Sequence, residues 1–103
     1  MTLSESKLAY QDCFDAYDRG LEAERGIRIH FPTYRDAKYF SMRMNQARSL
    51  DRKANARTYP KDHPLYGASN YDSLVLRVKE DVEGDWWVYI EPNTAIPGEV
   101  EVL

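Results

Sequence analysis

The chain has 103 residues and a formal net charge of −3, so we expect one domain over residues 1–103. With 43% hydrophobic residues it is too apolar to be disordered, and its longest uncharged apolar run, Trp86 to Ile90, is far shorter than a membrane span. A single cysteine, Cys13, forms no disulfide within the chain, so nothing favours an oxidising compartment and we expect a cytoplasmic protein.

The first predicted element is a helix over residues 4–24, which Ser4 or Ser6 can cap and Gly26 can end. Its apolar side chains recur at the spacing of one helix face: Tyr10, Cys13, Phe14, Tyr17 and Leu21. A strand follows over residues 27–31, where apolar residues alternate with Arg28 and His30 until Pro32 ends the run.

A second helix is predicted over residues 33–57. Thr33 stands at the N-cap with Asp36 three residues later, close to a capping box. The apolar residues of this helix lie within one arc of the helical wheel: Ala37, Phe40, Met44, Ala47, Leu50 and Ala54.

The second half of the chain predicts a loop over residues 58–70 and a hairpin of strands 71–80 and 85–91, with its turn at Gly84. Residues 92–103 are either a loose tail or contain a short edge strand at 99–102, where glutamates alternate with valines.

The order α-β-α-β-β predicts an α+β fold in which two helices pack on one face of a small three-stranded, mainly antiparallel sheet. The sheet face towards the helices should hold Ile27, Ile29, Phe31, Leu74, Leu76, Val78, Trp86, Val88 and Ile90. The residues that we expect to be nearly buried are Phe14, Tyr17, Leu21, Ile29, Phe40, Met44, Leu76, Val88 and Ile90.

Alternation then places basic and aromatic residues together on the opposite sheet face, for which no third helix remains. The candidate partner-binding residues are Trp87, Tyr89, Arg77, Lys79, Arg28 and His30. Trp, Tyr and Arg are favoured anchors of protein interfaces, and aromatic rings among cations also suit base stacking. A third interpretation is a small second core, in which Tyr59, Tyr66 or Ile96 folds over the two aromatic residues.

Charge is segregated along the chain. Residues 33–57 carry seven Lys or Arg against two acids (net +5), whereas residues 1–25 carry net −3 and residues 72–103 net −6. The candidate nucleic-acid surface is the basic face of the second helix, comprising Arg35, Lys38, Arg48, Arg52, Lys53 and Arg57. The alternative is a solvated face with some arginines paired to Asp12, Asp15 or Asp18.

No motif in the sequence supports catalysis or metal binding, so we expect no enzyme, no cofactor and no metal. His30 and His63 have no ligands at metal spacing, and Cys13 lies on the apolar stripe beside acids that disfavour its thiolate. The acids between Glu80 and Asp85 are explained by solvation of a hairpin turn.

The sequence therefore predicts a small non-enzymatic binding domain that contacts a protein partner, as an adaptor or an inhibitor. Its size and composition also suit accessory proteins of phages or mobile elements. The alternative is a nucleic-acid-binding protein with a preference for single strands. Homo-oligomerisation stays open, and no membrane partner is expected.

Overall fold

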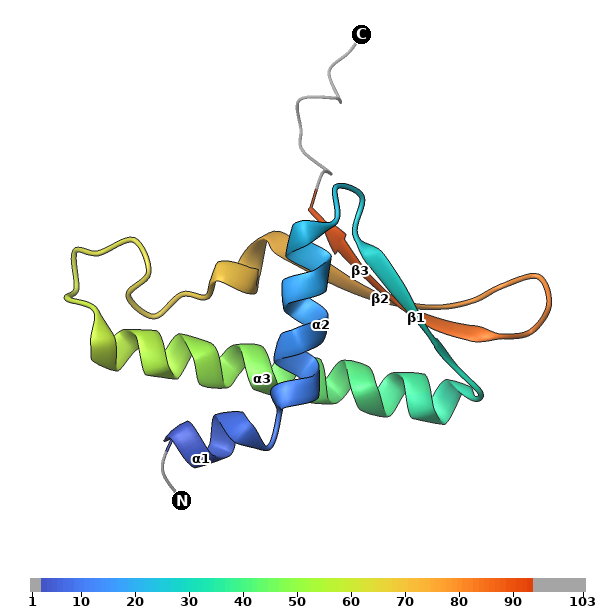
Figure 1. The fold of residues 1–103 in the computed structure, drawn as a ribbon, viewed down its shortest axis with the longest axis horizontal. Coiled ribbons are helices and arrows are strands. Elements are labelled where there is room, and N and C mark those ends of the chain that lie inside the picture. The colour runs from blue at the N-terminus through green and yellow to red at the C-terminus, as the bar shows by residue number, and fades with distance from the viewer. Residues whose placement is uncertain (1–2, 94–103) are drawn as a thin grey trace, which may run out of the picture.

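The computed structural model describes residues 3–93, so the expected strand at 99–102 lies outside the described residues. The elements in chain order are α1 (Leu3–Leu8), α2 (Gln11–Glu22), β1 (Ile27–Phe31), α3 (Tyr34–Thr58), the short 3-10 helix η1 (Asn70–Ser73), β2 (Leu74–Glu80) and β3 (Trp86–Pro92). The strand order is β1-β3-β2 and both pairings are antiparallel. Helices α2 and α3 pack on the same face of this sheet, which confirms the predicted α+β fold (Figure 1).

The prediction of one continuous helix over residues 4–24 is wrong, because a turn at Ala9 and Tyr10 separates α1 from α2. The backbone of Tyr10 leaves the helical region at φ −117 and ψ 23. The carbonyl of Ala9 accepts a hydrogen bond from Arg43 Nη2 of α3 at 2.9 Å, so this carbonyl keeps a partner outside the helix. The turn lets α1 and α2 pack separately on α3, and this tertiary contact overrides the local helical preference.

The second helix forms as predicted, because its N-terminus is fixed by its own sequence. Thr33 has an extended backbone, and its Oγ1 accepts a hydrogen bond from the Asp36 amide at 3.1 Å. Helix α3 then runs to Thr58, one residue beyond the predicted range.

The inner sheet face is the one predicted from alternation. Val88 and Ile90 are fully buried, and the half-buried apolar residues of the strands pack against the same core. Among the residues expected to be nearly buried, Phe14, Tyr17 and Met44 are also buried, whereas Ile29, Phe40 and Leu76 are half-buried.

Leu21 is the exception, because it is 45% exposed. Gly20, and not Leu21, faces the sheet: a Cβ atom on Gly20 would lie 2.8 Å from Ile90 Cγ2. Because Gly20 has no side chain, α2 can approach β3 closely along this side. Leu21 is the next residue, about 100° further round the helix, and it therefore points towards solvent.

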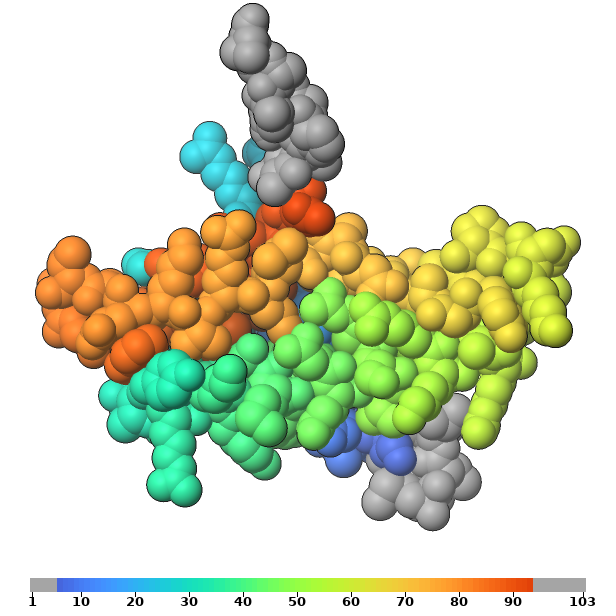
Figure 2. Space-filling view, turned by 180° about the vertical axis from the view of Figure 1, so that it is seen from behind, coloured from blue at the N-terminus to red at the C-terminus, as the bar shows by residue number. Residues whose placement is uncertain are grey.

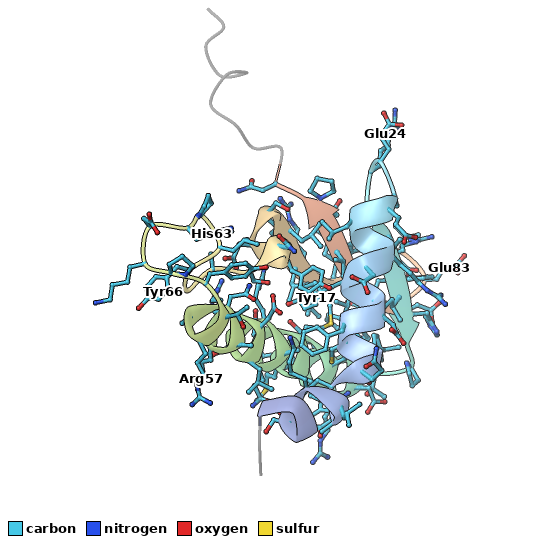
Figure 3. The ribbon with its side chains drawn as sticks, turned by 60° about the vertical axis from the view of Figure 1, so that its left-hand side comes forward. Tyr17, Glu24, Arg57, His63, Tyr66 and Glu83 are labelled. Atoms are coloured by element: carbon cyan, nitrogen blue, oxygen red, sulfur yellow. The ribbon has the colours of Figure 1, made fainter. Side chains whose placement is uncertain are left out.

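The loop that follows α3 lies at the opposite end of the molecule from the β2–β3 turn (Figures 1 and 2). Tyr59 stacks on His63 at 4.2 Å, and Tyr66 is 40% exposed. Figure 3 shows His63 and Tyr66 on one side of the molecule and Glu83 of the hairpin turn on the other. Tyr59 and Tyr66 therefore do not form the second core that was one interpretation of the sequence, and Ile96, the third residue of that interpretation, lies outside the described residues.

Replacement of Ile90 by Ala tests the core. Ile90 is fully buried at the centre of the sheet, so Ile90→Ala should lower the free energy of unfolding by roughly 2–5 kcal/mol. Leu21→Ala, which removes an exposed leucine from α2, is the control and should change it by less than about 1 kcal/mol. Equal losses for the two variants in urea titrations would contradict the packing of α2 described here.

Candidate functional site

The three strands bring all six predicted partner-binding residues together on the sheet face away from the helices. In the central strand, Trp87 pairs with His30 of β1 and Lys79 of β2. Tyr89 of the same strand pairs with Arg28 and Arg77. We call this surface the outer face and define it as Arg28, His30, Arg77, Lys79, Trp87 and Tyr89.

Trp87 is held on the outer face by three neighbours. The guanidinium carbon of Arg28 lies 3.8 Å from the ring centroid, within cation–π range. The His30 ring packs on the indole at an interplanar angle of 63° with the centroids 5.1 Å apart, and the indole Nε1 donates a hydrogen bond to Asp81 Oδ2 at 2.8 Å. These contacts fix the orientation of the largest side chain of the outer face before any partner binds.

Tyr89 has a similar environment one step further along the sheet. Lys79 Nζ lies 5.1 Å from its ring centroid, and Arg28 Nη1 donates to its hydroxyl at 3.4 Å. Both aromatic rings of the outer face are therefore accompanied by cations of the protein itself, so the surface presents positive charge over an apolar layer.

Two polar pairs at the margins of the outer face, one of them between Arg77 and Glu91, are open to solvent. His30 Nε2 lies 3.2 Å from Asp85 Oδ1, and Arg77 Nε lies 3.7 Å from Glu91 Oε1, with all four side chains 35–52% exposed. Exposed pairs of this kind contribute about 0–1 kcal/mol, so a carboxylate from a partner can replace the internal one at little cost.

The hairpin turn supports the outer face through Asp81. Its carboxylate accepts from the amides of Glu83 and Asp85 at 2.9 and 3.0 Å, in addition to the indole of Trp87. The Trp87 hydrogen bond is the main reason that the pKa of Asp81 lies below its ordinary value. From the sequence we expected Asp81 to be solvated. The signal for its structural role is its position before a glycine turn, where an aspartate accepts hydrogen bonds from backbone amides two and four residues later.

Oxygen atoms of Asp81, Glu83 and Asp85 lie within 4.8 Å of one another, an arrangement that the sequence analysis did not anticipate. The oxygens of Asp81 already accept three N–H groups, and Asp85 faces His30. The three acids therefore lie close together because the backbone and side chains of the turn hold them there.

Two residues of the predicted nucleic-acid surface are engaged within the fold: Arg48 is half-buried, and Arg52 is exposed but paired with an acid. Arg48 donates to the carbonyls of Tyr71 and Leu74 at 2.8 Å each, and Arg52 pairs with Asp72 of η1. The four other basic residues of that prediction, Arg35, Lys38, Lys53 and Arg57, are exposed. Within residues 3–93 none of these four makes an ion pair, and Figure 3 shows Arg57 projecting from the end of α3.

Two potential nucleophiles, Cys13 and Tyr17, are buried. Burial, together with the neighbouring Asp12, raises the pKa of Cys13 to about 11, and burial raises that of Tyr17 to about 12. Both groups stay uncharged near neutral pH and belong to the hydrophobic core. None of the helices in the described part of the chain is both long and apolar enough to cross a membrane.

The chain matches no protein-family model, no curated protein and no solved structure. The functional argument therefore depends on the geometry of the surfaces alone.

Acid titration of Asp81, followed at the Trp87 indole, tests the hydrogen bond that joins the hairpin turn to the outer face. The Asp81 carboxylate stabilises the fold while ionised, so its contribution is present above the ordinary pKa of 3.8 and is lost as the pH falls through the lowered value. In NMR spectra, the Trp87 indole N–H resonance should shift with a midpoint below pH 3.8, whereas that of Trp86 serves as the internal reference. A midpoint at or above this value, or the same titration in Asp81→Asn, would show that the hydrogen bond is absent in solution.

Proposed function

We propose that this protein is a non-enzymatic binding domain whose outer face docks onto an acidic surface of a protein partner, as an adaptor or an inhibitor. The observation that carries the proposal is the Arg28 guanidinium stacked 3.8 Å from the Trp87 ring on a sheet face away from the helices.

The outer face has the composition of a protein interface. Trp, Tyr and Arg are the residue types that most often dominate binding energy at such interfaces, and here they occupy adjacent strands. Trp87 is already oriented by Asp81, Arg28 and His30, so little side-chain entropy is lost when a partner binds. This preorganisation supports docking of a folded partner.

The same geometry favours an acidic protein surface over a nucleobase for this face. A base that stacks on Trp87 has to displace Arg28, and one that stacks on Tyr89 has to displace Lys79. A partner carboxylate instead reaches the cations where they lie and exchanges with the exposed pairs of His30 and Arg77.

Affinity capture with matched variants tests the proposal. The tagged protein and nuclease-treated extract of its native cells should yield a protein partner. Purified, that partner should bind Arg77→Ala/Lys79→Ala at least about 30-fold more weakly, as expected for loss of interface anchors. Both replaced side chains are exposed, so the variant should unfold at the same temperature as the parent.

The control is Lys53→Ala/Arg57→Ala, which removes the same charge from the far end of α3 and should bind like the parent. The proposal fails if no captured protein shows this difference between the two double variants. The double variant Trp87→Ala/Arg77→Ala should also abolish binding, with the fold checked by circular dichroism because Trp87 is half-buried.

A further inference from the structure

The N-terminal half of α3 carries a second group of exposed aromatic and basic residues, away from the outer face. Tyr34, Tyr39 and Met42 are 49%, 63% and 50% exposed, which is unusual for side chains of their size. They line a shallow hollow of about 300 Å³ with Arg35 and Lys38. We call these five residues the tyrosine patch; the segment that contains them forms part of the surface seen in Figure 2 (teal to green).

Among the described residues no cation lies over the rings of Tyr34 and Tyr39, in contrast to the rings of the outer face. Tyr34 packs against Trp86 at an interplanar angle of 64° with the ring centroids 4.8 Å apart. Among residues 3–93, Tyr39 makes no aromatic or cation–π contact. Because Tyr34 and Tyr39 are 49% and 63% exposed, their rings offer surface to a planar ligand.

The charge of the tyrosine patch has one sign. Arg35 and Lys38 are exposed, make no ion pair within the described residues, and share the hollow with no acidic side chain. Asp36, two residues before Lys38, lies about 200° around the helix from it. Arg35 also lies in the first turn of α3, where the helix dipole makes a cation unfavourable. An anionic ligand would remove this local repulsion.

We propose that the tyrosine patch binds single-stranded nucleic acid, with Tyr39 and Tyr34 stacking on unpaired bases and Arg35 and Lys38 pairing with phosphates. Open rings interleaved with cations are the combination that single-strand binders use. Paired bases of a duplex offer no free faces to these rings, and an acidic protein would use the cations but not the open rings. The inference is independent of the partner proposed for the outer face.

Fluorescence anisotropy with a labelled oligothymidine of about 15 nucleotides tests the proposal. Binding should be detected at low salt, and the affinity should fall with salt concentration with a log–log slope of about −1.4 for two phosphate contacts. Tyr39→Ala should weaken binding by roughly 5- to 150-fold, the loss of one stacked base, whereas Tyr39→Phe should retain it. Arg35→Ala/Lys38→Ala should abolish most of the salt dependence.

Three controls make the result decisive. Lys53→Ala/Arg57→Ala removes equal charge from the other end of α3 and should leave binding within about twofold of the parent. An abasic strand of the same length loses both stacked bases, so the parent should bind it at least as weakly as Tyr39→Ala binds oligothymidine. An oligoglutamate of equal length should bind much more weakly than oligothymidine.

The proposal is overturned if the parent does not bind at the lowest salt concentration, or if Tyr39→Ala binds like the parent. Equal affinity for oligoglutamate would assign the tyrosine patch to acidic proteins instead. An equal loss in Lys53→Ala/Arg57→Ala would show non-specific attraction to the whole helix.

Discussion

The arrangement of the molecule depends on Tyr17, the large side chain at which α2, α3 and η1 meet. Tyr17 is fully buried, so its hydroxyl requires a partner, and it donates to the carbonyl of Met44 in the middle of α3 at 2.7 Å. Its ring stacks on Tyr71 of η1 with the centroids 4.8 Å apart. This contact holds both long helices against the same side of the sheet, and none of the described helices then packs on the other side.

The outer face has therefore to hold large aromatic residues without a covering layer of helices. It does so with contacts inside its own strands and turn: cations over the rings of Trp87 and Tyr89, and Asp81 at the indole nitrogen. The contacts that make these residues compatible with solvent also fix their orientation. In the proposed function, the partner would therefore meet side chains that the strands and the turn already hold in place.

Alternation was sufficient to predict both faces of the sheet, because register in a sheet with one buried face is set by side-chain period alone. The break at Tyr10 could not be predicted, because neither glycine nor proline marks it and the residue that stabilises it, Arg43, is more than thirty positions away. The roles of Arg48 and Arg52 depend on η1, a short element within the predicted loop and hairpin. Long-range partners of this kind leave no periodic pattern in the sequence.

The tyrosine patch was missed for a related reason. Sequence analysis placed its cations on the basic face of the helix but had no means to decide whether Tyr34 and Tyr39 were core or surface. The structure decides this, because α3 uses Ala37, Met44 and Ala47 for its buried contacts and leaves the tyrosines outside. Two surfaces of different chemistry then lie on one small molecule, one with cations over its rings and one with exposed tyrosine rings.

The central claim is that the outer face is open to a partner in the free protein. Solvent paramagnetic relaxation of the full chain, measured by NMR with a soluble gadolinium chelate, tests it most directly. We predict strong relaxation at the side chains of Arg77 and Lys79 and at the exposed edge of Tyr89, and protection at Val88 and Ile90. Protection of the outer face to the same degree as the inner one would show that another segment or a second copy covers it, and would contradict the account.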